Sequence, residues 1–335
     1  MKEYILFDNI DIYTKIVETK PLDLLVNILL LSYLSLAKKY NEILEYTTYL
    51  LINSSIYNNN ILIENFYLLG YIGTGDIANS KAQVKLNLSI DPENAYTHLL
   101  NSLIEKKEGK DYLSEIKKAY LFLPDTEKNI FMSELNFKKE ELEREKDLYI
   151  IPDNIYKKEE PLVKKIQDAI KQDPGNPIFK ISIAEALYKA DRIEEAEMYI
   201  ASVLAQYPNY PRALFIAKEI AKLHSEEEKE IKYFEKILNV DFLSPYLNEK
   251  AQAFIEKDDY GKLVELKELF KSPDNPFIAF FKKETENIFP EKNEQIPQVI
   301  QTKKIEDDLK NSFDLLKEKK YAKALAGFIK ELKKK

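Results

Sequence analysis

The stretch from Pro174 to Pro208 constrains the fold most, because it has the pattern of a complete helix-turn-helix unit between two prolines 34 residues apart. Pro177 suits the first turn of the first helix, where its missing amide hydrogen costs nothing. Tyr207-Pro208 ends the second helix, since proline inside a helix loses a hydrogen bond and clashes with the preceding turn. Both helices carry apolar residues at helical spacing: Phe179, Ile183, Ala184, Leu187 and Tyr188 in the first, and Ile193, Ala196, Tyr199, Ile200, Val203 and Leu204 in the second.

Related units recur on both sides of this stretch. The interval from Pro92 to Pro124 is 32 residues, and Asp241 falls 34 residues after Tyr207, so the period persists where the proline does not. The chain has only 7 glycines, which disfavours the many tight turns of a β-rich fold. Because one helix pair cannot bury its apolar faces alone, the sequence predicts an all-α fold, an α-solenoid of antiparallel helix-turn-helix repeats.

Breaks in the repeat pattern suggest how the chain is divided. Residues 1–150 form N-terminal repeats and residues 151–289 a central block, with the junction near residues 148–158. Residues 290–302 are polar, contain two prolines and have the character of a linker. Residues 303–335 resume the pattern as a last helix pair without a capping helix. This pair is either capped by its own lysines or cut from a longer array.

The N-terminal sequence gives no sign of export or of a membrane span. Acidic residues interrupt the apolar ones directly after Met1, unlike the unbroken apolar core of a secretory signal. The most apolar stretch, residues 22–37, is shorter than the roughly 20 residues that span a bilayer. We expect a core helix there, in a pair that is covered on more than one side. The expected location is cytoplasmic, or periplasmic if the chain has been trimmed.

Composition argues against several kinds of chemistry. The net charge of −7 disfavours a general nucleic-acid binder, which needs a basic face. There is no cysteine, and neither His98 nor His224 has the spacing of a metal ligand, so we predict a structural or surface role for both. No catalytic, cofactor-binding or metal-binding residue is predicted, and the protein is not expected to be an enzyme. An unusual carboxylate enzyme would need a closed pocket between the two repeat blocks with paired buried acids.

The central unit resembles a tetratricopeptide repeat, a family with a 34-residue period, small residues where the two helices cross and a proline at the end of each unit. Ala184 and Ala196 match the small crossing residues, and Leu187 and Ile200 the larger fillers beside them. The family's tryptophan is absent. Further matches to the same pattern are Leu69-Gly70, Gly75-Asp76, Asp91-Pro92, Arg192 to Ala196 and Tyr321 to Leu325.

The resemblance implies that peptide segments bind along a concave face built by the first helix of each pair. Aromatic side chains with polar tips suit such a groove, because they offer contact area at a small entropy cost. The predicted groove residues are Tyr67, Tyr71, Thr97, Asn101, Ile181, Glu185, Tyr188, Arg212, Phe215 and Glu219.

The leading hypothesis is therefore a non-enzymatic scaffold that binds protein or peptide partners through this groove, with no cofactor and no nucleic acid. An alternative is a structural or assembly subunit of an envelope-associated machine for secretion, pili or motility. It is motivated by the hydrophobic first pair and by residues 301–335, which hold 11 lysines against 6 acids. Membrane contact is expected only through this basic end. Partner identity and oligomeric state do not follow from the sequence.

Overall fold

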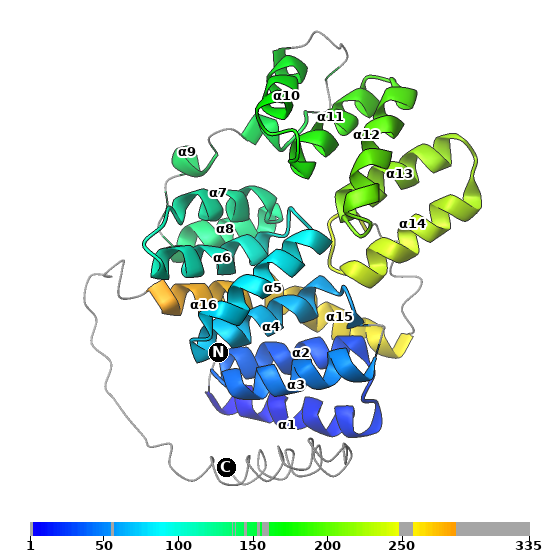
Figure 1. Cartoon of the computed structure of the whole chain (residues 1–335). Coiled ribbons are helices and arrows are strands. Elements are labelled where there is room, and N and C mark those ends of the chain that lie inside the picture. The colour runs from blue at the N-terminus through cyan, green and yellow to red at the C-terminus, as the bar shows by residue number, and fades with distance from the viewer. Residues whose placement is uncertain are drawn as a thin grey trace.

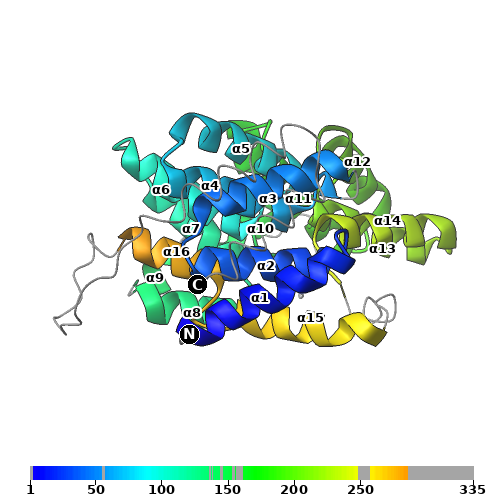
Figure 2. The same ribbon diagram turned by 90° about the horizontal axis from the view of Figure 1, so that it is seen from below.

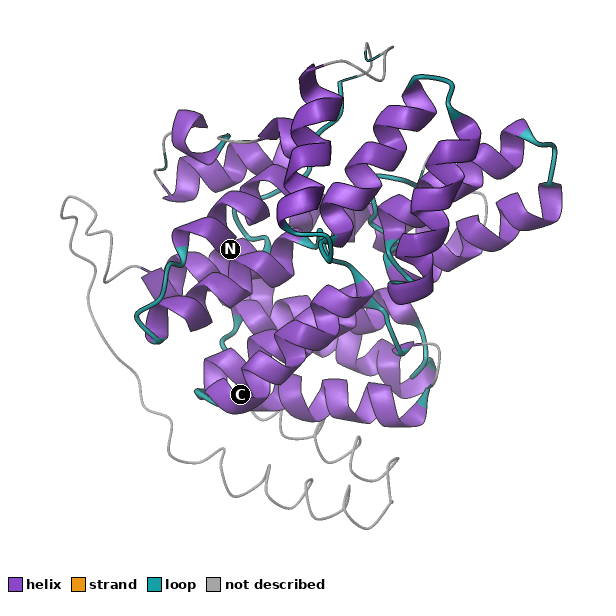
Figure 3. Cartoon of the chain, turned by 45° about the horizontal axis from the view of Figure 1, so that its top comes forward, coloured by secondary structure: helices purple, strands orange, loops and turns teal. Residues whose placement is uncertain are grey.

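The computed structural model describes residues 3–54, 57–135, 137, 139–143, 146–152, 155, 161–247 and 257–285. Within these ranges every regular element is a helix, which confirms the predicted all-α fold (Figures 1 and 3). The linker predicted at 290–302 and the helix pair predicted at 303–335, including the repeat match at Tyr321, lie outside the described residues.

The helices follow one another with short connections. The first part of the chain forms α1 (Glu3–Thr19), α2 (Leu24–Leu36), α3 (Tyr40–Asn53), α4 (Ile61–Thr74), α5 (Ile77–Ile90), α6 (Ala95–Lys107), α7 (Leu113–Phe122), α8 (Asp125–Leu135), α9 (Lys139–Leu142) and the short 3₁₀ helix η2 (Lys146–Leu148). The second part forms α10 (Pro161–Gln172), α11 (Pro177–Lys189), α12 (Ile193–Gln206), α13 (Pro211–Leu223), α14 (Glu227–Val240), α15 (Lys257–Phe270) and α16 (Pro276–Thr285).

Consecutive helices pack as antiparallel pairs, as a solenoid requires. α3 packs on α4, α6 on α7, α11 on α12 and α13 on α14. The central pair forms where the prolines and small residues predict it. Asn176 caps α11 by accepting a hydrogen bond from the amide of Ile178 at 3.0 Å, and Pro177 occupies the first turn. Ala184 and Ala196 are fully buried where α11 and α12 meet.

α2 is covered on several sides, as its uniformly apolar sequence predicts. It contacts α1, α3, α4, α15 and α16, and residues 25–35 are all buried. The polar residues inside this layer are Asn27, Ser32 and Ser35, and Asn27 donates to the hydroxyl of Tyr57 at 2.8 Å and accepts from Tyr46. A helix that is apolar all round has to be buried on all faces, so α2 forms the centre of the core.

α15 and α16 return to the N-terminal helices, although the sequence assigns residues 257–285 to the central block. Both helices pack on α2, and α16 also contacts α6 and α8 (Figure 2). The ring of Phe277 lies 4.8 Å from that of Phe66 and 4.6 Å from that of Tyr96, measured between centroids. The repeat period sets only which helices pair locally. The choice of α2 as a neighbour follows from matching apolar faces, which a local pattern does not encode.

The described helices therefore form two bodies. The first body consists of α1–α9 with α15 and α16, and the second body of α10–α14 (Figure 1). The main buried cluster of the first body and that of the second, which runs from Leu148 to Ile220, are separate. No described helix combines the length and apolar character needed to cross a membrane.

Candidate binding pocket at the junction of the two bodies

A cavity of about 260 Å³ lies where the first body meets the second. Its wall combines the turn between α5 and α6, the segment from α7 to α8, residues 149–151, the facing sides of α11 and α13, and residues 241–246. We call this cavity the junction pocket. Its charged lining residues are Asp91, Glu93, Glu127, Glu185, Arg212 and Asp241.

Arg212 joins the two bodies at one side of the junction pocket. Pro211 begins α13, so Arg212 lies in its first turn and points back toward the N-terminal helices. Its Nη1 atom lies 2.6 Å from Oε1 of Glu93 in the α5–α6 turn, and its Nη2 atom lies 2.6 Å from Oε2 of Glu185 in α11. The guanidinium also approaches Oγ of Ser182 at 3.3 Å. This single buried cation is thus shared by carboxylates of both bodies.

The ion pairs decide the ionisation of these groups. Burial disfavours the ionised form of Glu185, but Arg212 and Lys189 outweigh it and hold its pKa below the usual value. Burial raises the pKa of Glu93 even though Arg212 opposes the shift. Burial would lower the pKa of Arg212, yet Glu93 and Glu185 hold it well above its ordinary value. Arg212 is therefore a permanent cation.

Three further acids face the junction pocket from three different elements. Asp91 ends α5 and accepts a hydrogen bond from the amide of Glu93 at 3.1 Å. Asp241 ends α14 in the same way and accepts from the amide of Leu243 at 2.9 Å. Glu127, in the first turn of α8, accepts from the Tyr96 hydroxyl. We call Asp91, Glu127 and Asp241 the junction carboxylates.

The junction carboxylates repel one another. Burial, with Glu93 and Asp241 nearby, raises the pKa of Asp91 to about 8. Burial also raises the pKa of Glu127 to about 7, where Asp241 adds to the shift and the Tyr96 hydrogen bond and Lys271 oppose it. Burial alone accounts for the rise of the Asp241 pKa to about 6. These acids therefore gain or lose protons near neutral pH.

Aromatic rings complete the wall of the junction pocket. Tyr96, Phe122, Tyr149 and Tyr246 line it beside the acids. Phe122 and Tyr149 meet edge to face with ring centroids 5.6 Å apart. Tyr246 stacks on Phe215 of α13 at 5.2 Å. These contacts hold the rings in place, and the Tyr246–Phe215 stack connects the junction pocket with the outer surface of the second body.

Four predicted groove residues lie along this connected surface. Tyr188 and Glu219 face each other from α11 and α13, since burial raises the pKa of Tyr188 and the charge of Glu219 adds to the shift. Phe215 is half-buried, with Nζ of Lys218 at 4.7 Å from its ring centroid. Glu185, the fourth, lies in α11 like Tyr188 and lines the junction pocket. We call Tyr188, Phe215 and Glu219 the α11–α13 surface.

The other predicted groove residues do not join this surface. Ile181 is 0% exposed in the core of the second body, so the prediction that it contacts a peptide is corrected. Arg212, 4% exposed, is likewise committed to Glu93 and Glu185. Tyr67 and Tyr71 in α4 contact each other, with their hydroxyls 2.7 Å apart, and Tyr67 also accepts from Thr48 of α3 at 3.2 Å.

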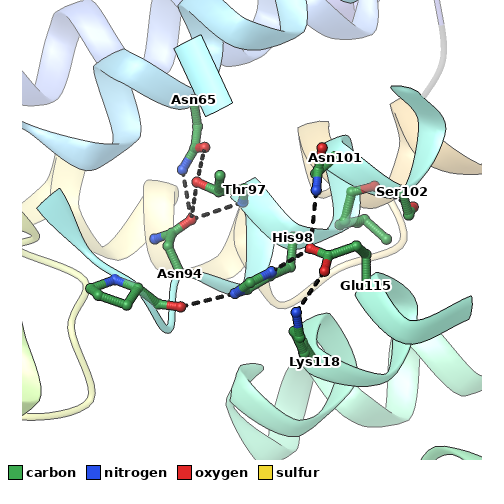
Figure 4. Close-up of polar contacts among 10 residues, drawn as sticks. Asn65, Asn94, Thr97, His98, Asn101, Ser102, Glu115 and Lys118 are labelled. Atoms are coloured by element: carbon green, nitrogen blue, oxygen red, sulfur yellow. Dashed lines mark hydrogen bonds and ion pairs between the residues drawn. The ribbon is translucent and has the colours of Figure 1, made fainter. Parts of the chain in front are cut away.

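Thr97 and Asn101 belong to two groups of polar contacts made by α6, one with α4 and one with α7 (Figure 4). Thr97 is fully buried and donates to Asn65 at 2.7 Å, so it too is corrected as a groove residue. Asn101 donates to Oε2 of Glu115 at 3.1 Å. His98 lies between Glu115, 2.7 Å from Nδ1, and the carbonyl of Pro92, 2.9 Å from Nε2. Its contacts link α6 to α7 and to the preceding turn.

The sequence did not predict the junction carboxylates as a site. In the sequence, Asp91 and Asp241 only mark the ends of two repeat units. Their one shared signal is this equivalent position, an aspartate directly after the second helix of a pair. That the two turns face each other across a cavity depends on how the bodies meet, which the repeat period does not state.

Comparison with known proteins agrees with the geometry of the second body. Residues 163–218, which span most of α10 to α13, match the family model described as tetratricopeptide repeat. No curated protein matches the chain.

Proposed function

The chain is a tetratricopeptide-like helical-repeat protein, and from that premise we propose that it is a non-enzymatic scaffold that binds a protein or peptide partner through the α11–α13 surface. Repeats of this kind generally bind protein partners. The observation that carries the proposal is the placement of Tyr188, Phe215 and Glu219 on adjacent first helices, half-buried, with Phe215 stacked on Tyr246 of the junction pocket. Rigid aromatic bodies beside a polar rim are typical of binding surfaces.

The first body supports this choice of surface by contrast. There α16 lies against α2 and α6, and Phe277 contacts rings of α4 and α6, so the chain itself covers the corresponding helix faces. Phe277, Ile278 and Phe281 are almost completely buried in these contacts. The α11–α13 surface carries no such covering helix among the described residues. A partner segment therefore has room at the second body.

The junction pocket also bears on the carboxylate-enzyme alternative, because it holds buried acids between the two bodies. Binding is favoured over catalysis by the contacts that these acids make. Asp91 and Asp241 each accept a hydrogen bond from a backbone amide in the turn that follows their helix. Glu127 accepts hydrogen bonds from Tyr96 and Asn275. Each acid thus has a structural task, no histidine is among the residues that line the cavity, and its serine, Ser244, accepts a hydrogen bond from the amide of Tyr246.

Affinity purification with the intact chain, followed by mass spectrometry, tests the proposed function. We expect a specific partner that is retained by the wild-type chain and lost from the double variant Tyr188→Ala/Phe215→Ala. Tyr199→Ala, which removes a half-buried tyrosine from the second helix α12, is the matched control and should retain the partner. Equal recovery of the partner with the double variant and the wild type would rule out this surface.

A further inference from the structure

The junction pocket has an excess of carboxylates over cations. Arg212 is paired with Glu93 and Glu185 at 2.6 Å each. That pairing leaves the junction carboxylates, Asp91, Glu127 and Asp241, of which Asp91 and Glu127 are 8% and 7% exposed. Lys271 is the cation whose charge reaches Glu127, and it does not line the cavity. Buried carboxylates are stable when a cation pairs with them.

The spacing of these acids distinguishes between kinds of cation. Asp91, Glu127 and Asp241 are close enough for the charge of Asp241 to shift the pKa values of the other two acids. No group of three histidine or acidic side chains in the described part of the chain is close enough to hold a metal ion. The carboxylates lie around the wall of the cavity rather than at one point. This arrangement suits an organic cation, such as an ammonium or guanidinium group, better than a bare metal ion.

The aromatic wall supports the same conclusion independently. Tyr96, Phe122, Tyr149 and Tyr246 line the cavity together with the acids, and ring faces attract ammonium and guanidinium groups. The cavity volume of about 260 Å³ is below the roughly 300–1,000 Å³ typical of pockets for drug-sized ligands. It therefore fits one side chain better than a cofactor.

We propose that the junction pocket binds the cationic side chain of a lysine or arginine from the protein partner. The inference rests on the proposed function, because the junction pocket adjoins the α11–α13 surface: its lining residue Tyr246 stacks on Phe215, and its lining residue Glu185 lies in α11. The partner segment places its basic side chain in the cavity while neighbouring residues lie on Tyr188 and Phe215. Arg212 shows the same chemistry within the chain, since it is a cation held by buried carboxylates.

Binding of such a cation is linked to proton release. Asp91 faces Glu93 and Asp241, Glu127 faces Tyr96, Asp241 and Lys271, and all three junction carboxylates have raised pKa values between about 6 and 8. An arriving ammonium group favours their ionised forms and lowers these pKa values. The affinity for the cation therefore rises between pH 6 and pH 8, and the junction carboxylates release protons when the cation binds.

Isothermal titration calorimetry on the full chain tests the assignment with three probes. These are the pentapeptide Ac-Ala-Ala-Lys-Ala-Ala-NH₂, its norleucine analogue, which lacks the ammonium group, and free 1,5-diaminopentane. We expect the lysine peptide to bind at least tenfold more tightly than the norleucine peptide. Its affinity should be higher at pH 8 than at pH 6, and titrations in buffers of different ionisation enthalpy should report proton release.

The variant Glu127→Gln/Asp241→Asn preserves the shape and hydrogen bonds of both side chains while removing their charges. It should weaken binding of the lysine peptide at least tenfold, whereas Glu228→Gln, a charge removed from the exposed face of α14, should leave it unchanged. Circular dichroism verifies that both variants are folded. Equal binding of the lysine and norleucine peptides, or unchanged binding by the double variant, overturns the inference.

Free diamine binding more tightly than the lysine peptide would also overturn it, since the pocket would then serve a small amine rather than a side chain. The outcomes separate this inference from the proposed function. If Tyr188→Ala/Phe215→Ala abolishes partner recovery while Glu127→Gln/Asp241→Asn does not, the scaffold function stands and the cation pocket fails.

Discussion

The guanidinium of Arg212 in α13 lies 2.6 Å from the carboxylate of Glu93, which is 119 residues earlier in the chain. This ion pair joins two helical bodies whose main apolar cores are separate and which also share a small buried cluster of Ile61, Ile90 and Val240. A buried pair of this kind adds little stability compared with apolar packing, but breaking it is expensive because the remaining charge has no partner. Together with that apolar cluster, the ion pair therefore helps to set where the second body sits on the first.

Replacing Arg212 tests that role. Arg212→Met leaves the carboxylates of Glu93 and Glu185 in a poorly solvated site, and we expect the free energy of unfolding to fall by about 3–5 kcal/mol in urea titrations. Lys171→Met breaks an exposed pair with Asp168 and should change it by less than about 1 kcal/mol. Adding Glu93→Gln and Glu185→Gln to the Arg212 variant should restore part of the loss. Similar values for the two single variants would contradict the buried pair.

The junction carboxylates predict an unusual pH dependence of stability. Their pKa values in the folded chain, about 8 for Asp91, about 7 for Glu127 and about 6 for Asp241, exceed the roughly 3.9–4.3 of unfolded chains. The folded state therefore binds more protons in this interval, so stability is greatest below about pH 4 for these groups and is lost as the pH rises toward 8. Burial raises the pKa of Glu45 to about 8 and that of Glu64 to about 7, and both add to the slope.

Urea titrations between pH 5 and pH 8 measure this slope. The variant Glu127→Gln/Asp241→Asn should flatten it, since neutral amides do not titrate. Glu228→Gln, on the solvent face of α14, should keep the wild-type slope. An unchanged slope in the double variant would mean that these two acids titrate at ordinary values.

The network around His98 shows the opposite dependence through Glu115. Burial would raise the pKa of Glu115, but His98 and Lys118 outweigh it and hold the pKa far below its usual value. Its stabilising contribution is present above the unfolded pKa of about 4.3 and is lost as the pH falls below that value. Glu115→Gln should reduce the free energy of unfolding at pH 7 by about 1–3 kcal/mol, because the buried His98 loses its carboxylate partner.

Glu226→Gln provides the control for Glu115, since it removes only an exposed contact with Lys229. Thermal and urea unfolding at pH 7 should leave this control within about 1 kcal/mol of the wild type. If Glu115→Gln and Glu226→Gln changed the free energy of unfolding equally, the His98–Glu115 contact would not stabilise the first body.

The return of α16 to the first body predicts a large effect of Phe277→Ala. Phe277 is fully buried between Phe66 and Tyr96, and truncating such a ring in a core costs about 3–5 kcal/mol. Hydrogen exchange should increase in α2 and α6 as well as in α16. Met198→Ala on α12, where the side chain is 74% exposed, should have almost no effect on either measurement. Faster exchange confined to α16 would mean that it only lies over an independently stable body.

Much of the fold follows from local patterns. The spacing of apolar residues, the prolines at Pro177 and Pro208 and the small residues Ala184 and Ala196 are sufficient to predict the central helix pair, because helix periodicity and termination are local properties. The uniformly apolar stretch in α2 predicts a helix buried on several sides for the same reason. The half-buried positions of Tyr188, Phe215 and Glu219 also follow from the repeat pattern.

Contacts between segments far apart in the sequence could not be predicted from local patterns and are known only from the tertiary structure. The repeat period does not encode that α16 covers α2 and α6 or that Arg212 forms an ion pair with Glu93. It also does not encode that Ile181 lies in the core rather than in a groove. It also cannot place Asp91 and Asp241 around one cavity, since these residues are 150 positions apart. The sequence by itself determined the all-helical class and the helix pairs of the second body, because these depend on hydrogen bonds and apolar spacing within a few turns. Only the packed chain decided which faces meet and where charges are buried, because those depend on shape and charge matching between helices far apart in sequence.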